Sequence, residues 1–402
     1  MWARKRIDIG WLDLHFALSR AGMRLSKYLL TNKCVTPYIE SEWSADSDAF
    51  VCLSVRTGFD ILLAKLKLPA GSEVLMSAVT IQDMARIIEH HGLVPVPIDL
   101  DPATMAPTPE ALEAAITPQT KAILIAHLFG GIIDLSPYAN IAKKHDLILI
   151  EDCAQAFDGD EYRGHPESNV VMFSFGPIKT ATALGGAILT IRNAELLSQM
   201  KDQHSKYLFQ NQWSFFKRVC TYTVLKFIGG YYAFGLLVKL CRLMGKDYET
   251  LLNGAVRNFP ADEFFQSIRQ QPTSALCLLL KRRINKFNAI RQDRRIESGR
   301  LLTELLTPHF HCPGTELIRH TFWVFPVEVQ DKTEIVSRLR KAGFDAASAS
   351  QLAPISPPES RPEMFPRQVS KCLDRVIYLP FYPEMPDSEL KRMARVMLDI
   401  KS

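Results

Sequence analysis

The amino-acid sequence predicts an α/β protein, with a large domain built on a mainly parallel sheet and a smaller α+β domain at the C-terminus. Between about residues 50 and 192, short apolar, β-branched segments alternate with helix-like segments, the pattern of a sheet buried on both faces. After about residue 200 this pattern changes. The composition, 47% hydrophobic and 23% charged in 402 residues, is that of a globular chain long enough for two domains.

The elements follow one another in a regular order. Strands of the large domain are predicted over 73–76, 94–98, 122–127, 147–150, 170–175 and 187–191, and helices over 60–66, 82–91 and 136–144. In the C-terminal part we predict a basic helix from about 275 to 300, strands over 322–329 and 375–379, and helices over 331–343 and 387–400. The predicted domains are an N-terminal arm (1–45), a large domain (46–205), an aromatic and basic insertion (206–260) and the C-terminal domain (261–402).

Charge and cysteine content narrow the class of protein. The net charge of +5 is mild, and no helix-turn-helix or zinc-finger spacing favours nucleic acid or a metal site. Eight scattered cysteines without a C-x-x-C pair indicate reduced thiols. Asp8 and Asp13 interrupt the apolar run that a secretory signal needs, so we expect a cytoplasmic protein.

Polar side chains follow the ends of two predicted strands. Asp152 and Gln155 come after strand 147–150, and Lys179 comes after strand 170–175. Ligands of open α/β sheets bind outside the carboxyl ends of the strands. A carboxylate there can pair with a protonated pyridine nitrogen, the small Ala154 can lie against a ring face, and Gln155 can donate to a phenolate oxygen.

These residues predict pyridoxal 5'-phosphate (PLP) as the cofactor. Lys179 lies near Gly185 and Gly186, which leave room for a cofactor, and a Schiff-base lysine with a depressed pKa is expected in such a setting. The freed amine is then the base for the proton shift. Ser174 is a candidate phosphate ligand.

A phosphate cradle is predicted at the start of the helix that follows residue 54. The segment 54–59 combines Ser54, Arg56 and Thr57 with a helix N-terminus, whose free N–H groups attract anions. An ordinary helix cap at Ser54 is the alternative.

The motifs together resemble the DegT/DnrJ/EryC1/StrS family of PLP-dependent sugar aminotransferases, which have fold type I. Residues 127–130 resemble the family's H-L-Y-G, residues 151–155 its E-D-A-A-Q, residues 174–179 its S-F-x-P-x-K, and residues 379–383 its C-terminal L-P-x-x-P. The resemblance implies that Lys179 is the Schiff-base lysine, that Asp152 and Gln155 contact the ring, and that Ser174 binds phosphate. Val55-Arg56 and Ile81 depart from the pattern, the latter where the family has an aromatic residue that stacks on the ring.

The resemblance also implies an activity and an assembly. Family members that act as dehydratases carry histidine in place of Lys179, so the lysine favours amino transfer. The expected enzyme is a homodimeric aminotransferase of polysaccharide biosynthesis that moves an amino group from a donor such as glutamate to a nucleotide-linked keto-sugar. Partner-subunit residues of the family align with Ser267 and Arg269. Two alternatives stay open: a PLP enzyme of another type, acting as a dehydratase or on a lipid or acyl substrate, and a non-catalytic, membrane-associated homologue.

The insertion has two interpretations. Its apolar run, 224–238, contains Lys226 and is shorter than the roughly 18 residues of a membrane-spanning helix. It is therefore either a helical insertion in the core or dimer interface, or an amphipathic segment that rests on the inner membrane surface.

Overall fold

The computed structural model describes the whole chain except residues 5, 23–34, 246–247, 249–262, 349–351 and 400–402. Its centre is a sheet of seven strands: β1 (Ala49–Cys52), β2 (Glu73–Ser77), β4 (Val94–Ile98), β5 (Thr120–Ala126), β7 (Ile148–Asp152), β8 (Val170–Ser174) and β9 (Ala187–Ile191). Their spatial order is β1-β9-β8-β7-β5-β2-β4. Strands β8, β7, β5, β2 and β4 are parallel, whereas β9 is antiparallel to β8 and β1. The mainly parallel sheet of the predicted α/β class is confirmed.

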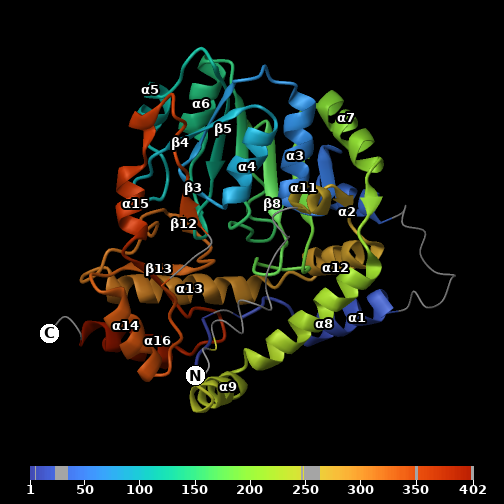
Figure 1. Cartoon of the computed structure of the whole chain (residues 1–402). Coiled ribbons are helices and arrows are strands. Elements are labelled where there is room, and N and C mark those ends of the chain that lie inside the picture. Colours follow the sequence, from blue (N-terminus) through green and yellow to red (C-terminus); the bar gives the residue numbers. More distant parts are fainter. Residues whose placement is uncertain (5, 23–34, 246–247, 249–262, 349–351, 400–402) are drawn as a thin grey trace.

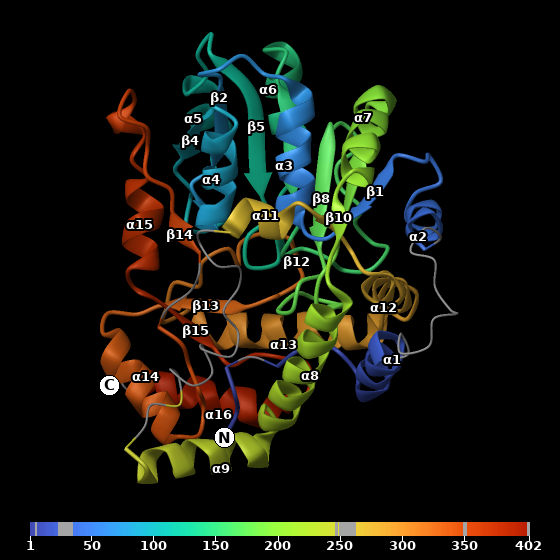
Figure 2. The same cartoon turned by 45° about the vertical axis from the view of Figure 1, so that its right-hand side comes forward.

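Helices cover both faces of this sheet (Figures 1 and 2). One face packs against α3 (Val55–Leu66), α4 (Gln82–His90) and α7 (Ala194–Ser205). The other packs against α5 (Pro109–Ala114), α6 (Ser136–Lys144), α1 (Trp11–Gly22), α2 (Thr36–Trp43) and α12 (Ser274–Asn285). Along β5, Leu124 faces the first layer and Ile123 the second, because strand side chains alternate. Both sets must be apolar, which explains the continuous hydrophobic runs.

The predicted elements of the large domain agree with the structure within a few residues, and α6 has the predicted bounds. The edge strand β1 was not among the predicted strands. The single basic helix predicted from 275 to 300 is wrong, because two helices, α12 and α13 (Ala289–Leu306), occupy this region. Asn288 lies between them with extended backbone, and its side chain accepts a hydrogen bond from the N–H of Arg291. This cap begins a new helix.

The C-terminal part has its own core. The antiparallel pair β13 (Phe325–Glu328) and β15 (Val376–Leu379) packs with α13, α14 (Lys332–Lys341) and α16 (Asp387–Leu398). Three short helical elements are α11 (Phe264–Ile268), α15 (Arg367–Leu373) and the 3-10 turn η3 (Pro362–Met364). Three short strand pairs are β10 (Leu208–Phe209) with β11 (Gln270–Gln271), β6 (Gly131–Ile132) with β12 (Arg319–His320), and β3 (Val79–Thr80) with β14 (Ala353–Pro354). The last two pairs join the large domain to the C-terminal part. Helix α12 shares the core of α1, so the expected domain boundary near residue 261 stays a prediction.

The insertion forms two helices on the outside of the molecule, α8 (Gln212–Ile228) and α9 (Tyr231–Leu243) (Figure 2). Taken singly, no helix in the described part of the chain is long and apolar enough to cross a membrane. Helices α8 and α9 reach that length and hydropathy only as a pair, which is bent by 89°. The seven cysteines that the structure describes all have free thiols.

Candidate active site

The predicted site residues converge at the carboxyl ends of two adjacent parallel strands. Asp152 ends β7 and Ser174 ends β8, and the register pairs Asp152 with Met172. Lys179 follows in a tight turn, in which its backbone N–H donates to the carbonyl of Gly176 at 3.0 Å. The positive charge of Lys179 acts on Asp152. The structure therefore brings the predicted lysine and carboxylate to one site.

Asp152 is a carboxylate whose charge the protein itself satisfies only in part. Burial raises its pKa above the usual range, and the Ala154 N–H and the charge of Lys179 offset this only in part. Its Oδ1 accepts a hydrogen bond from the Ala154 N–H at 2.9 Å, and within the described ranges no hydrogen bond reaches its Oδ2. A cationic N–H group facing Asp152 would favour its ionised form.

Gln155 is held in one orientation by the backbone. Its Oε1 accepts a hydrogen bond from the Phe129 N–H at 2.8 Å, and the side chain is nearly buried. The amide –NH₂ group is left as the donor that Gln155 presents to the site. The loop that carries Phe129 needs left-handed backbone at both Phe129 (φ 58°) and Gly130 (φ 101°).

A buried network beneath the site fixes the end of β7. Glu151 accepts hydrogen bonds from His127 Nε2 (2.9 Å), the hydroxyls of Tyr162 (2.5 Å) and Ser168 (2.9 Å), and the backbone N–H of His165 (2.8 Å). Burial opposes the charge of Glu151, but these donors lower its pKa to about 2. His127 thus stabilises the end of β7, next to Asp152, through its hydrogen bond to Glu151.

Trp323 is a site residue that the sequence analysis missed. The Nζ of Lys179 lies 4.4 Å from the centroid of its indole ring, within the range of a cation–π interaction. The indole N–H donates to the carbonyl of Ile178 at 2.9 Å, which fixes the ring against the turn. Trp323 lies in none of the sequence motifs and is distant from Lys179 along the chain.

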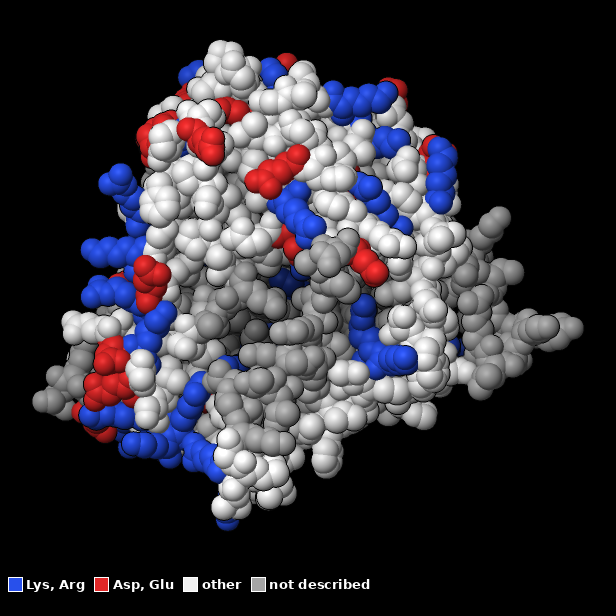
Figure 3. Space-filling model, viewed as in Figure 1, with Lys and Arg blue, Asp and Glu red and all other residues white. Residues whose placement is uncertain are grey.

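A cavity of about 110 Å³ lies beside Lys179, between the large domain and the C-terminal part. Its lining includes Thr180, Arg291, Arg295, Trp323 and Tyr378. The space-filling view shows a hollow near the middle of the face that is drawn, with basic atoms at its upper edge (Figure 3).

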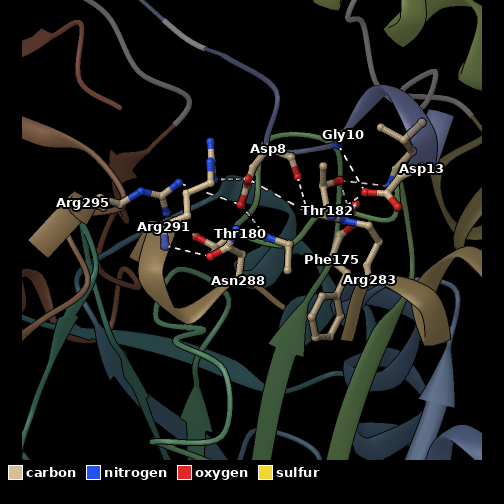
Figure 4. Close-up of polar contacts among 12 residues, drawn as sticks. Asp8, Gly10, Asp13, Phe175, Thr180, Thr182, Arg283, Asn288, Arg291 and Arg295 are labelled. Carbon is tan, nitrogen blue, oxygen red and sulfur yellow. Dashed lines mark hydrogen bonds and ion pairs between the residues drawn. The ribbon is translucent and has the colours of Figure 1, made fainter. Parts of the chain in front are cut away.

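The N-terminal arm forms hydrogen bonds with the turn that carries Lys179 (Figure 4). Asp8 Oδ2 accepts a hydrogen bond from the Ala181 N–H at 2.8 Å, two residues after Lys179, where the backbone is left-handed (φ 53°). Burial alone would raise the pKa of Asp8, but Arg291, Arg295 and Arg283 hold it below its usual range.

Two arginines extend this contact between the arm and the turn. Arg295 Nη1 donates to Thr180 Oγ1 at 3.0 Å. Arg283 donates both to the Asp8 carbonyl (2.8 Å) and to the Thr182 carbonyl (3.2 Å). No motif or pattern in the sequence indicates that residues 180–182 and the arm form one unit.

The predicted phosphate cradle at the N-terminus of α3 is occupied by contacts within the chain. Ser54 Oγ caps the helix by accepting from the Thr57 N–H at 3.2 Å, and Thr57 Oγ1 donates to the Ile268 carbonyl at 2.8 Å. Arg56 pairs with Asp83 at 2.6 Å. These contacts support the helix-cap interpretation of Ser54, and the phosphate role stays a prediction. Arg269, expected to reach a partner subunit, makes two 2.9 Å hydrogen bonds to Asp60 of its own chain.

Comparison with known proteins shows which family the large domain resembles. The sequence model of the DegT/DnrJ/EryC1/StrS aminotransferase family matches residues 42–222. This match covers slightly less than half of the chain, and over these residues the chain is similar to the family. GDP-perosamine synthase of Caulobacter vibrioides is 34% identical over 156 residues, which are 38% of this chain and 42% of that protein. L-glutamine:2-deoxy-scyllo-inosose aminotransferase of Streptomyces kanamyceticus is 39% identical over 146 residues, 35% of this chain and 34% of that protein. The chain thus matches less than half the length of these curated relatives.

Several solved structures resemble the chain over nearly its whole length. An aminotransferase of Streptoalloteichus hindustanus superposes with a TM-score of 0.70 and 17% identity, covering 98% of this chain and 97% of that one. A GDP-4-keto-6-deoxy-D-mannose-3-dehydratase of E. coli reaches 0.69 with 14% identity, covering 98% of this chain and 99% of that one. This likeness confirms the predicted fold type I. Because both an aminotransferase and a dehydratase share the fold, the fold alone does not choose between their reactions.

Proposed function

We propose that this protein is a PLP-dependent aminotransferase that uses Lys179 to hold the cofactor. The observation that carries the proposal is the meeting of Lys179 and Asp152 at the ends of β8 and β7, in a chain whose residues 42–222 match the model of an aminotransferase family. The lysine also distinguishes this reaction from dehydration, for which the family resemblance implies histidine at the same position.

The residues at the strand ends have the chemistry that PLP requires. Asp152 has an oxygen to which no described residue donates, and a pyridinium N–H would supply that hydrogen bond. Gln155 presents its amide –NH₂ while its oxygen is held by Phe129, so it can donate to the ring hydroxylate. Ala154 leaves room for the ring, and bound PLP supplies an electron sink for the substrate carbanion.

The phosphate is assigned to Ser174 and to the N-terminus of α3, where Ser54, Arg56 and Thr57 stand. Arg56 is paired with Asp83, the hydroxyls of Ser54 and Thr57 are bonded to each other at 3.0 Å, and the Thr57 N–H already donates to Ser54 Oγ. Among the described residues, Ser174 Oγ has only a long contact of 3.4 Å with the Gly176 N–H. A helix N-terminus binds anions without a side chain. We therefore expect Ser174 to contribute more to phosphate binding than Ser54.

For the substrates we propose an amino donor such as glutamate or glutamine and a nucleotide-linked keto-sugar. The support comes from two relatives, one named for the product GDP-perosamine and one for glutamine and an inosose. The cavity beside Lys179 is lined by Arg291 and Arg295, whose charges suit an anionic substrate. A homodimer is proposed on the family resemblance.

The proposal is tested by absorption spectroscopy of the purified protein with PLP. We expect a visible absorption band, its loss when glutamate is added as the cofactor takes up the amino group, and no band in the Lys179→Ala variant. The exposed Lys206→Ala, which breaks only a surface pair with Asp202, is the matched control and should keep the band. A band that persists in Lys179→Ala would refute the role of the lysine, and a band that glutamate and glutamine leave unchanged would refute amino transfer.

A further inference from the structure

Helices α8 and α9 each bury one side and leave the other uncovered. In α8 the inner side chains Phe215, Val219 and Tyr222 are buried in the region where the helix packs against α1. In α9 the inner side chains Phe234 and Val238 are buried with Ala3 of the N-terminal arm. The hydrophobic core of the molecule is thus complete without the outer sides of these helices.

The outer sides are nevertheless apolar. In α8, Trp213, Val224 and Phe227 are exposed, and in α9 a stripe at helical spacing is formed by Tyr232, Leu236, Leu240 and Leu243. The exposed fractions reach 67% for Phe227, 76% for Leu243 and 87% for Tyr232. Trp11 and Leu12 at the start of α1 are exposed as well.

These side chains are concentrated in one part of the molecule. Eleven of the eighteen large apolar side chains that are exposed in the described part of the chain belong to α1, α8, α9 and the adjoining Met244. Single exposed apolar residues are ordinary, but a group of this size marks an interaction surface. We call it the α8–α9 face, defined by Trp11, Leu12, Trp213, Val224, Phe227, Tyr231, Tyr232, Leu236, Leu240, Leu243 and Met244.

The charged residues of the insertion itself have one sign. Between Asp202 and Asp247 the sequence contains seven lysines and arginines and no acidic residue. Lys217 lies 5.7 Å from the Trp213 ring, Lys226 lies 5.4 Å from the Trp11 ring, and Lys239 and Arg242 are exposed beside the apolar stripe of α9. At the lower edge of the molecule, where α9 lies, the visible charged atoms are basic (Figure 3).

We propose that the α8–α9 face docks on an anionic lipid bilayer, with both helices lying in the plane of the membrane surface. An apolar face bordered by lysine and arginine fits an interface between acyl chains and negative headgroups, and tryptophan and tyrosine favour that depth. The 89° bend and the short helices suit a surface position. A second copy of the chain placed face to face would set basic residues against basic residues, so charge complementarity favours lipid.

The docking surface adjoins the candidate active site. Lys226 of α8 lines a cavity of about 320 Å³ together with Asp8, Thr180 and Arg291, and the last three also line the cavity beside Lys179. The proposal itself does not depend on the reaction that Lys179 carries out.

The test is flotation of the full-length protein with vesicles. At low salt we expect it to float with vesicles of phosphatidylglycerol and phosphatidylcholine, to float less with phosphatidylcholine alone, and to be released as salt rises. The double variant Lys239→Gln/Arg242→Gln should lower partition into anionic vesicles roughly thirtyfold, since each basic residue near the surface contributes about fivefold. Phe227→Ser/Leu236→Ser/Leu243→Ser should abolish flotation.

The matched control is Ile290→Ser/Ile318→Ser, which removes two equally exposed apolar side chains outside the face (81% and 101% exposed) and should float like the wild type. Thermal unfolding confirms that all variants remain folded. The proposal is overturned if the wild type does not float, if both vesicle types bind it equally, or if the control loses as much binding as the face variant. It is also overturned if the triple serine variant reduces the mass of the protein in solution, because the face is then a contact between copies.

Discussion

The contact between Asp8 and the turn after Lys179 allows a prediction about stability. Asp8→Asn keeps the size of the side chain and an oxygen that can accept the Ala181 N–H, so the change removes mainly the charge. That charge faces Arg291 directly and lies 3.8 Å from Arg295 Nη2, and only 15% of the Asp8 side chain is exposed. Two unit charges at this separation attract by about 4 kcal/mol at an effective dielectric constant of 20.

The net effect is smaller than this attraction, because both partners lose hydration on burial. Removing one member of a buried pair commonly costs about 3–5 kcal/mol, since the other charge is left without compensation. We expect Asp8→Asn to lower the free energy of unfolding by about 3 kcal/mol at pH 7. The folded-state pKa of Asp8 is depressed, so this difference is fully present above the unfolded pKa of about 3.9 and shrinks as pH falls through the folded value.

Urea unfolding followed by tryptophan fluorescence measures this difference, with the transitions of the two parts of the chain fitted separately if they do not coincide. Asp202→Asn is the control, because Asp202 and its partner Lys206 are both largely exposed and the midpoint should not move. An Asp8→Asn midpoint equal to that of the control at pH 7 would show that the arm does not stabilise the fold, and the reasoning about the buried arginines would be wrong.

Two further predictions concern the supports of the site. Glu151→Gln should destabilise the protein by about 3 kcal/mol at pH 7, because its amide –NH₂ would face hydrogen-bond donors. The folded-state pKa of Glu151 is about 2, so the stability advantage of the wild type should decline only as pH falls from about 4.5 toward 2. Urea unfolding of both proteins across this pH range measures the difference. Gly130→Ala should lower the melting temperature by several degrees more than Gly71→Ala does. Both glycines have positive φ, but only a Cβ at Gly130 would clash, because it would lie 2.5 Å from the Trp323 backbone nitrogen. Equal shifts of the melting temperature in calorimetry would contradict this.

The large domain could be predicted from the sequence because its signals are local. A strand buried on both faces must be continuously apolar, and the polar residues that follow it, such as Asp152 and Lys179, stand at the sheet edge where ligands bind. Their proximity follows from strand adjacency alone.

Contacts between distant segments could not be predicted in the same way. Trp323 reaches Lys179 from the C-terminal part, and Asp8 reaches Ala181 across more than 170 residues. The periodic pattern of apolar residues along the sequence does not indicate which distant residues contact each other. The break between α12 and α13 was missed for a different reason, since the capping role of Asn288 depends on one side-chain hydrogen bond inside an otherwise helical pattern.

The distribution of site residues along the chain bears on specificity. Residues 42–222, where the family match lies, contain Asp152, Gln155, Ser174 and Lys179, which are the groups assigned to the cofactor. The cavity beside Lys179 is instead lined largely by the N-terminal arm and by residues beyond 290, outside that match. Cofactor chemistry can therefore be shared with the family while the acceptor differs, because different segments contact each. Substrate identity is best sought by varying Arg4, Arg291 and Trp323 and asking which keto compounds are still aminated.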